Sequence, residues 1–519
     1  MDRCNLISRI EESNTLWDVI IIGGGATGLG AAVEASSRGY KTLLIEQHDF
    51  AKATSSRSTK LVHGGVRYLQ QGNVSLVFEA LHERGLLKQN APHLVFNQAF
   101  VVPVYDWWGG PFYGIGLKMY DLLAGKLGLG PSKIISREET ISLIPNVEPE
   151  GLRSGVIYYD GQFDDSRLAI DLAKTALDLD GVVINYMKAV GLLKTNGLIS
   201  GVAAVDEETG KEYTLNARVV VNATGVFTDT ILKMDDPSAR DIVAISQGVH
   251  LVLDRKFLPG DSAIMVPQTD DGRVLFAVPW HNKVVVGTTD TELESASLEP
   301  VALEEEINFI LTHAQRYMEN NPTRADVKSA FAGLRPLVRP AEGKNTAAIS
   351  RDHFLTVSDS GLITITGGKW TTYRRMGEDT INKAEAIAGF DPRPCITKSM
   401  RIHGWLKNVS KEDPLYFYGS DSIAVKNIAE TDTTLSEKIH DALPYIKAEV
   451  IWHVRNEMAR TVEDVLARRT RSLLLDAKAS ISMAPAVASI MAKELNKPLD
   501  WEKQQVEQYT QLAKNYIIN

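Results

Sequence analysis

Three glycines near the start of the chain are spaced as in loops that bind a dinucleotide. Residues 23–28, GGGATG, have the pattern G-x-G-x-x-G. In such a loop Gly23 permits a tight turn, Gly25 lets the backbone approach a pyrophosphate, and Gly28 lets a helix pack closely on a strand. Glu46 ends the next apolar run, where its carboxylate could accept hydrogen bonds from ribose hydroxyls. Both NAD and FAD use this fingerprint, so the motif alone leaves the cofactor open.

Two later turns could contact the same ligand. Residues 219–225, VVVNATG, read as a short apolar strand whose end resembles the second nucleotide contact of flavoproteins, although an ordinary strand end has the same pattern. In residues 364–380 a Gly-Gly pair opens a helix. The positive end of that helix, together with Lys369, could stabilise the negative charge of a reduced flavin. The alternative for Lys369 is a solvated surface side chain.

The elements that must position these residues follow from periodicity. Around the first motif we expect a strand over Asp18–Ile22, a helix over about Thr27–Arg38 that stops at Gly39, and a strand over Thr42–Ile45. This is the β-α-β unit of a doubly wound sheet. Strand-rich segments such as GVHLVL and KVVVGTTD follow later in the chain.

The last part of the chain has a helical pattern. It follows a proline-rich break at residues 391–395, DPRPC. Residues 449–476 are predicted to form its most regular helix, with an apolar stripe on one side. The arginines on the other side are expected to form a solvated or ion-paired face: Arg455, Arg460, Arg468, Arg469 and Arg471.

Composition excludes several classes of protein. The 519 residues carry a net charge of -9, which does not favour nucleic acid as a partner. Two cysteines, Cys4 and Cys395, cannot form a disulfide framework or a cysteine-rich metal site, and no metal site is predicted. We expect no membrane-spanning segment and no signal peptide, because no apolar run is long enough.

The segment ATSSRSTKLVHGGVRYL, residues 53–69, has neither helical nor strand periodicity. With this segment the sequence resembles the FAD-dependent glycerol-3-phosphate dehydrogenases. The resemblance covers nearly the whole chain, and the motifs occur in the order of the family. The other pieces that carry it are IIGGGATGLG, VVVNATG, GVHLVL, VPWHNKVVVGTTD, FAGLRPLVRP, AAISRDHFL and TGGKWTTYR.

The resemblance implies non-covalent FAD, since no cysteine or histidine obviously anchors a flavin. In the family the segment 53–69 winds beside the isoalloxazine ring. The residues expected to bind the cofactor are Gly23, Gly25, Gly28, Glu46, Thr54, Ser56, Ser58, Lys60, Leu61, Ala223, Gly225, Gly368, Lys369 and Thr371.

The substrate implied by the resemblance is a small polyol phosphate, and arginine forks suit its phosphate. The expected substrate-binding residues are Arg67, Arg335, Arg351 and Lys369. Oxidation of the C2 alcohol also needs a base. His250 is the candidate, although a lone histidine in an apolar strand is more often a core residue. Arg335 and Lys369 could stabilise the developing alkoxide and complete the catalytic set.

The fold implied is α/β, with a doubly wound, Rossmann-like FAD domain, an inserted mainly β substrate-capping domain and a C-terminal helical domain. The boundaries expected are an oxidoreductase region at 15–390, divided into an FAD domain of about 15–90, 150–235 and 330–390 and a cap of about 91–149 and 236–329, followed by helices at 391–519.

The expected reaction is oxidation of sn-glycerol 3-phosphate to dihydroxyacetone phosphate, with the electrons passing to a membrane quinone. One alternative is an oxidase of the same superfamily that uses oxygen, and another is a flavin-binding assembly protein without turnover. Residues 105–130 are rich in aromatic residues and glycine, which favours contact with a membrane interface, or else a core segment. The expected location is therefore peripheral, on the cytoplasmic side of the cell membrane, and a homodimer is a further expectation.

Overall fold

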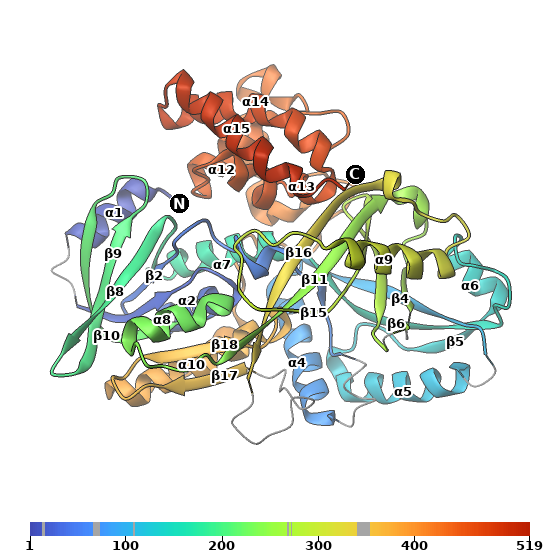
Figure 1. Ribbon diagram of the computed structural model, residues 1–519, viewed down its shortest axis with the longest axis horizontal. Helices are drawn as coiled ribbons and strands as arrows, with labels where there is room; N and C mark the ends of the chain where they lie inside the picture. The colour runs from blue at the N-terminus through green and yellow to red at the C-terminus, as the bar shows by residue number, and fades with distance from the viewer. Residues whose placement is uncertain are drawn as a thin grey trace.

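The protein contains two β-sheets and a helical C-terminal region that packs over both of them (Figure 1). The structure is a computed structural model, and it describes residues 1–12, 16–65, 73–106, 109–266, 269–270, 272–339 and 353–518. The predicted α/β class, with a nucleotide-binding sheet, a second sheet and a helical C-terminal region, is confirmed.

The first sheet is built around the predicted β-α-β unit. Its main order is β17-β18-β10-β1-β2-β7, and β1 (Trp17–Ile22) runs parallel to both β2 (Thr42–Ile45) and β10 (Glu212–Asn222). The predictions for β1 and β2 hold to within one residue, whereas β10 begins seven residues before the predicted strand at 219–225. The other strands are β7 (Val182–Ile184), β8 (Met187–Thr195), β9 (Leu198–Asp206), β17 (His353–Val357) and β18 (Ile363–Gly367).

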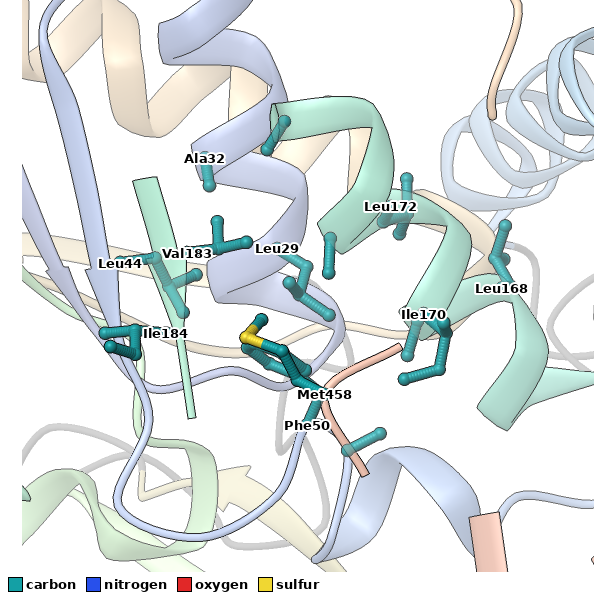
Figure 2. Close-up of a cluster of buried hydrophobic side chains, with 14 of the residues drawn as sticks. Leu29, Ala32, Leu44, Phe50, Leu168, Ile170, Leu172, Val183, Ile184 and Met458 are labelled. Carbon is teal, nitrogen blue, oxygen red and sulfur yellow. The ribbon is translucent and has the colours of Figure 1, made fainter. Parts of the chain in front are cut away.

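Helices cover this sheet closely. Helix α2 (Ala26–Ser37) packs against α7 (Asp165–Asp178) and against α10 (Tyr373–Ala388). Figure 2 shows how Leu29 of α2 and Leu172 of α7 meet side chains of β2 and β7 in one buried cluster. Met458, from the C-terminal region, reaches into the same cluster.

Glycines bring three of these elements into backbone contact. A Cβ atom on Gly28 would lie 1.9 Å from the carbonyl oxygen of Gly23, so α2 can approach the β1 turn only without a side chain there. A Cβ on Gly377 of α10 would lie 2.6 Å from the carbonyl oxygen of Gly30 in α2. The two helices therefore cross at a distance that only glycine permits.

The second sheet has the main order β15-β11-β14-β13-β12-β4-β6-β3, with β16 paired to β11 and β5 to β6. The predicted boundaries placed residues 154–163 and 330–338 with the nucleotide-binding unit, whereas β6 and β16 pair within this second sheet. An apolar strand pattern does not identify the sheet that the strand joins. The strands are β3 (Leu61–Val62), β4 (Val95–Val104), β5 (Lys133–Ser136), β6 (Ser154–Phe163), β11 (Val243–Asp254), β12 (Ala263–Val266), β13 (Leu275–Trp280), β14 (Lys283–Gly287), β15 (Thr291–Leu293) and β16 (Val327–Val338).

In the C-terminal region the prediction of one long helix over residues 449–476 is wrong. Residues 449–476 do not form a regular helix: α12 ends at Asn456, a short π-helix spans Asp464–Arg469, and Arg471 has a φ of 57° before α13 (Ser472–Leu475). The main helices here are α11 (Ser422–Thr431), α12 (Lys447–Asn456), α14 (Ala477–Leu495) and α15 (Leu499–Lys514).

The arginines of this segment explain the break. Arg468, Arg469 and Arg471 are at most 2% exposed, so they are ion-paired as predicted but do not form a surface face. Arg468 and Arg469 both bind Asp49 after β2, with a contact of 2.6 Å from Arg469. Arg471, which follows the π-helix, pairs instead with Asp164 at 2.9 Å, so the broken backbone directs these arginines to two different buried carboxylates.

The other described helices include α1 (Arg3–Glu11), α4 (Val74–Asn90), α5 (Gly109–Ala124), α6 (Arg137–Leu143), α8 (Thr228–Asp235) and α9 (Glu304–Tyr317). Across the ranges that the structure describes, none of the helices combines the length and apolarity needed to cross a bilayer.

Candidate active site

A cavity of about 370 Å³ lies where the two sheets meet. Its lining includes the segment after β2, the adjoining strands β11 and β16, and the turn after β18, together with side chains of β4, β6, β12 and β13. Its wall is mostly apolar and carries a few convergent polar groups, which is typical of a small-molecule site. The lining therefore brings together residues that are more than 300 positions apart in the sequence.

The glycine loop lies at the carboxyl ends of β1 and β10. Gly23 has a φ of 111°, and a Cβ there would lie 2.6 Å from the carbonyl oxygen of Ala223. Gly225, with a φ of 60°, follows directly after β10. The predicted nucleotide residues of the two strands are therefore neighbours in space, at the edge of a parallel sheet where such ligands bind.

Glu46 faces the glycine loop. Its Oε2 accepts a hydrogen bond of 2.6 Å from the backbone N–H of Gly24, and its Oε1 accepts one of 2.8 Å from the N–H of His48. Burial raises the pKa of Glu46, and the two N–H groups oppose that effect because they stabilise the carboxylate. The carboxylate is thus held beside the loop, in the position expected for a ribose contact.

A buried carboxylate fixes the segment after β2. Asp165, the first residue of α7, accepts hydrogen bonds from the backbone N–H and the hydroxyl of Ser58 and pairs with the ammonium of Lys60 at 2.8 Å. Lys60 also donates to the carbonyl oxygen of Ser56 and has a φ of 64°. Burial lowers the pKa of Lys60, and Asp165 opposes that shift. The ammonium of Lys60 therefore binds the protein's own carboxylate.

His250 of β11 lies in the wall of the cavity and is 2% exposed. Its ring stacks on Phe331 of β16, with centroids 4.9 Å apart, and its Nε2 is 2.9 Å from the hydroxyl of Thr59. Burial, together with the positive charges of Arg335 and Lys60, holds the pKa of His250 well below its usual 6.5. The imidazole is therefore neutral at neutral pH.

Arg335 of β16 is fixed beside His250. It donates to the hydroxyls of Ser246 and Thr288 and to the carbonyl oxygen of Thr289. Its guanidinium passes directly over Gly248, where a Cβ would lie 2.2 Å from Nη2. The glycine two positions before His250 thus makes room for the arginine.

The turn after β18 completes the site. Gly367 and Gly368 have φ values of 77° and 68°, and Lys369 follows them in the cavity wall. A short 3-10 turn, Trp370–Thr372, precedes α10, so this helix begins later than the Gly-Gly turn suggested. The hydroxyl of Thr371 accepts a hydrogen bond of 3.3 Å from the backbone N–H of His63.

Comparisons with known proteins agree with this arrangement. Residues 18–374 match the model of the FAD-dependent oxidoreductase family, and residues 364–506 match that of the C-terminal domain of alpha-glycerophosphate oxidase. The mitochondrial glycerol-3-phosphate dehydrogenase of Rattus norvegicus is 38% identical, over 98% of this chain and 74% of the rat protein. That of Schizosaccharomyces pombe is also 38% identical, over 99% of this chain and 89% of its own length.

The chain belongs to the FAD-dependent glycerol-3-phosphate dehydrogenase family. The solved glycerol-3-phosphate dehydrogenase of Bacillus halodurans, complexed with FAD, is 30% identical, has a TM-score of 0.81, and is matched over 99% of this chain and 98% of that one. The L-alpha-glycerophosphate oxidase of Mycoplasma pneumoniae, at 18% identity and a TM-score of 0.57, shares the fold. The family and the FAD cofactor predicted from the sequence are confirmed.

The residues of this family member fit FAD. Gly23, Gly24 and Gly25 offer a cradle without side chains, and Gly25, the N-cap residue of α2, supplies no side-chain cap, although the N–H of Ala26 donates to the hydroxyl of Ser55 at 2.9 Å. A Cβ on Gly25 would lie 3.0 Å from the hydroxyl of Ser55, so the space beside it is narrow. The pyrophosphate would bind there, and Glu46 would hold the ribose.

The predicted residues separate into groups. Those that line the cavity are Thr54, Ser58, Leu61, His250, Arg335, Gly368, Lys369 and Thr371. The residues at the nucleotide end are Gly23, Gly25, Gly28, Glu46, Ala223 and Gly225. Ser56 and Lys60 belong to the segment after β2 and are buried behind the cavity wall. Arg67 and Arg351 lie outside the described residues, as do Trp107 and Trp108 of the aromatic segment.

Sequence reasoning missed several polar residues of the cavity wall, among them Arg57, Thr59 and Arg273. Arg57 and Thr59 belong to the segment that the family resemblance singled out, so that motif was a sufficient signal for both. Arg273 stands in a stretch without any motif, and only the tertiary structure brings it to the cavity. The anchoring role of Asp165 was also missed, because its partner Lys60 is 105 positions away.

Proposed function

We propose that this chain oxidises sn-glycerol 3-phosphate to dihydroxyacetone phosphate with FAD as the cofactor that receives the electrons. The observation that carries the proposal is the meeting of a neutral, buried histidine, His250, with the cationic side chains of Arg335 and Lys369 in one cavity. A phosphorylated secondary alcohol needs both a base for its hydroxyl proton and cations for its charge.

The geometry supports the following roles. Arg335 binds the phosphate or the developing alkoxide, because three hydrogen bonds fix its guanidinium at the cavity wall. Lys369 adds a second positive charge at the turn after β18. His250 receives the proton of the C2 hydroxyl. FAD, when bound, supplies the acceptor for the hydride that leaves C2. The narrow, mostly apolar wall limits water around the reacting atoms.

Anaerobic mixing of the purified yellow protein with sn-glycerol 3-phosphate tests the proposal. The visible absorbance of the oxidised flavin should bleach as one equivalent of dihydroxyacetone phosphate forms. Glycerol, which lacks the phosphate, is the matched control and should leave the flavin oxidised. An unbleached flavin at high substrate concentration would exclude this function.

For the final electron acceptor we propose a membrane quinone, with the protein held peripherally on the cytoplasmic side of the cell membrane. Support comes from an apolar strip on two neighbouring helices: Val74 and Phe78 on α4, and Met119 and Leu122 on α5, are exposed, Leu122 to 81%. The spacings of three and four residues place each pair on one side of its helix. Both helices lie at the side of the molecule opposite α12, α14 and α15 (Figure 1).

The alternative electron acceptor is oxygen. An assay that compares oxygen with a quinone distinguishes the two. Rapid reoxidation of the reduced flavin by air, and slow reoxidation by a short-chain quinone, would identify an oxidase. The opposite order supports the dehydrogenase. A homodimer is part of the same proposal and is tested by sedimentation of the detergent-solubilised protein.

A further inference from the structure

His250 is held in a single orientation. One face of its ring stacks on Phe331, and Gly287 of the neighbouring strand lies so close that a Cβ there would be 2.5 Å from the Cδ2 of the ring. His250 and Phe331 are also directly paired across β11 and β16. The ring cannot turn between these neighbours, so its two nitrogens keep different surroundings.

The two nitrogens of His250 differ in access. Nδ1 is buried and has no hydrogen-bonding partner among the described residues. Nε2 has one partner, the hydroxyl of Thr59, at 2.9 Å. Thr59 lines the cavity and is less deeply buried than His250. A proton that reaches the imidazole from the cavity therefore meets the hydroxyl of Thr59 at the accessible nitrogen.

Thr59 is itself anchored on both sides. Its neighbours Ser58 and Lys60 both bind the carboxylate of Asp165, which is fully buried. The backbone of Thr59 is thus fixed at two adjacent points, and its side chain has only χ1 to adjust. A threonine hydroxyl can donate one hydrogen bond while it accepts another, so it can serve a base both before and after the base is protonated.

We propose that Thr59 relays the substrate proton to His250. The proposal rests on the function proposed above. As the hydride leaves C2 with two electrons for FAD, the C2 hydroxyl loses its proton to the Thr59 oxygen. The original Thr59 hydroxyl proton passes to Nε2 of His250. One O–H bond of the substrate is broken, one N–H bond is formed, and the Thr59 hydroxyl is regenerated.

Two variants test the relay in the FAD-loaded enzyme. Thr59→Val keeps the shape of the side chain without the hydroxyl, and Thr59→Ser keeps the hydroxyl. The rate of anaerobic flavin bleaching at saturating substrate should fall by about a hundredfold or more in Thr59→Val and by less than about threefold in Thr59→Ser. FAD content and the affinity for dihydroxyacetone phosphate, followed by the flavin spectrum, should not change in either.

A double variant separates a relay from two independent effects. If Thr59 and His250 act in series, Thr59→Val combined with His250→Gln should be no slower than His250→Gln alone. Losses that multiply, or a Thr59→Val enzyme that bleaches at the rate of the unmodified protein, would overturn the relay. If the unmodified protein is not bleached at all, it is the proposed function that fails.

A spectroscopic measurement supplies a readout that does not depend on turnover. In protein labelled with ¹⁵N-histidine, the Nε2 signal of His250 is identified by its loss in His250→Gln. That signal should shift in Thr59→Val and keep its position in Thr59→Ser. An unchanged signal in Thr59→Val would contradict the hydrogen bond on which the relay depends.

Discussion

At the scale of single residues, Arg335 gives a direct prediction. One terminal nitrogen of its guanidinium donates hydrogen bonds to Thr288 and Thr289, and the other donates to Ser246. Arg335→Lys keeps the charge but loses this geometry, which should cost about 1.5–3 kcal/mol of transition-state binding, or about ten- to a hundredfold in kcat/KM. Steady-state kinetics with a soluble dye measure the change. Unaltered kinetics would remove Arg335 from the site.

The neutral state of His250 gives a prediction about pH. Because burial and nearby positive charge lower its pKa well below 6.5, the base stays deprotonated as the pH falls through the range in which an exposed histidine would protonate. Flavin bleaching at saturating substrate should therefore keep its rate from about pH 7.5 to about pH 6. Stopped-flow rates across this range decide the point. A loss of half the rate near pH 6.5 would show that the imidazole is not shielded.

At the scale of elements, the crossing of α2 and α10 depends on glycine. Gly377→Ala would place a methyl group 2.6 Å from the backbone of Gly30, and the helices must separate to accept it. The expected cost is about 1–3 kcal/mol, seen as a lower midpoint of thermal unfolding. Gly116→Ala on α5 is the matched control, because nothing lies within 4 Å of a Cβ there. Equal midpoints for the two variants would contradict the close crossing.

At the scale of the whole molecule, the C-terminal region binds Asp49, at the start of the segment that carries Thr54 to Lys60. Burial alone would raise the pKa of Asp49, but the charges of Arg469 and Arg468 outweigh it and lower the pKa below its usual value. Removing one arginine leaves buried charge incompletely paired, so Arg469→Met should destabilise the protein by about 3–5 kcal/mol. Arg455→Met, which breaks an exposed pair with Glu494, should cost under about 1 kcal/mol. Thermal unfolding compares them, and similar midpoints would argue against this anchor.

The apolar strip on α4 and α5 gives a second prediction at this scale. Replacing Phe78 and Leu122 with serine should lower binding to lipid vesicles and slow quinone reduction, while dye reduction continues. Detergent should release the unmodified protein better than high salt, because the net charge is negative and the contact is apolar. Co-sedimentation with vesicles measures the binding. Unchanged vesicle binding in the double variant would place the membrane contact elsewhere.

Local patterns in the sequence determined the β-α-β unit and its glycine loop. The strands at 17–22 and 42–45 and the helix between them were predicted to within a residue, because their apolar periodicity and glycine turns are encoded in adjacent residues. Recognition of the segment 53–69 identified the family. Tertiary structure alone decided the partners of the charged side chains. Arg469 reads as a surface residue but binds Asp49, 420 positions away, and Lys60 reads as a flavin contact but pairs with Asp165. Asp49 and Asp165 lie far along the chain from the charges that they pair with, so no local pattern records either pair.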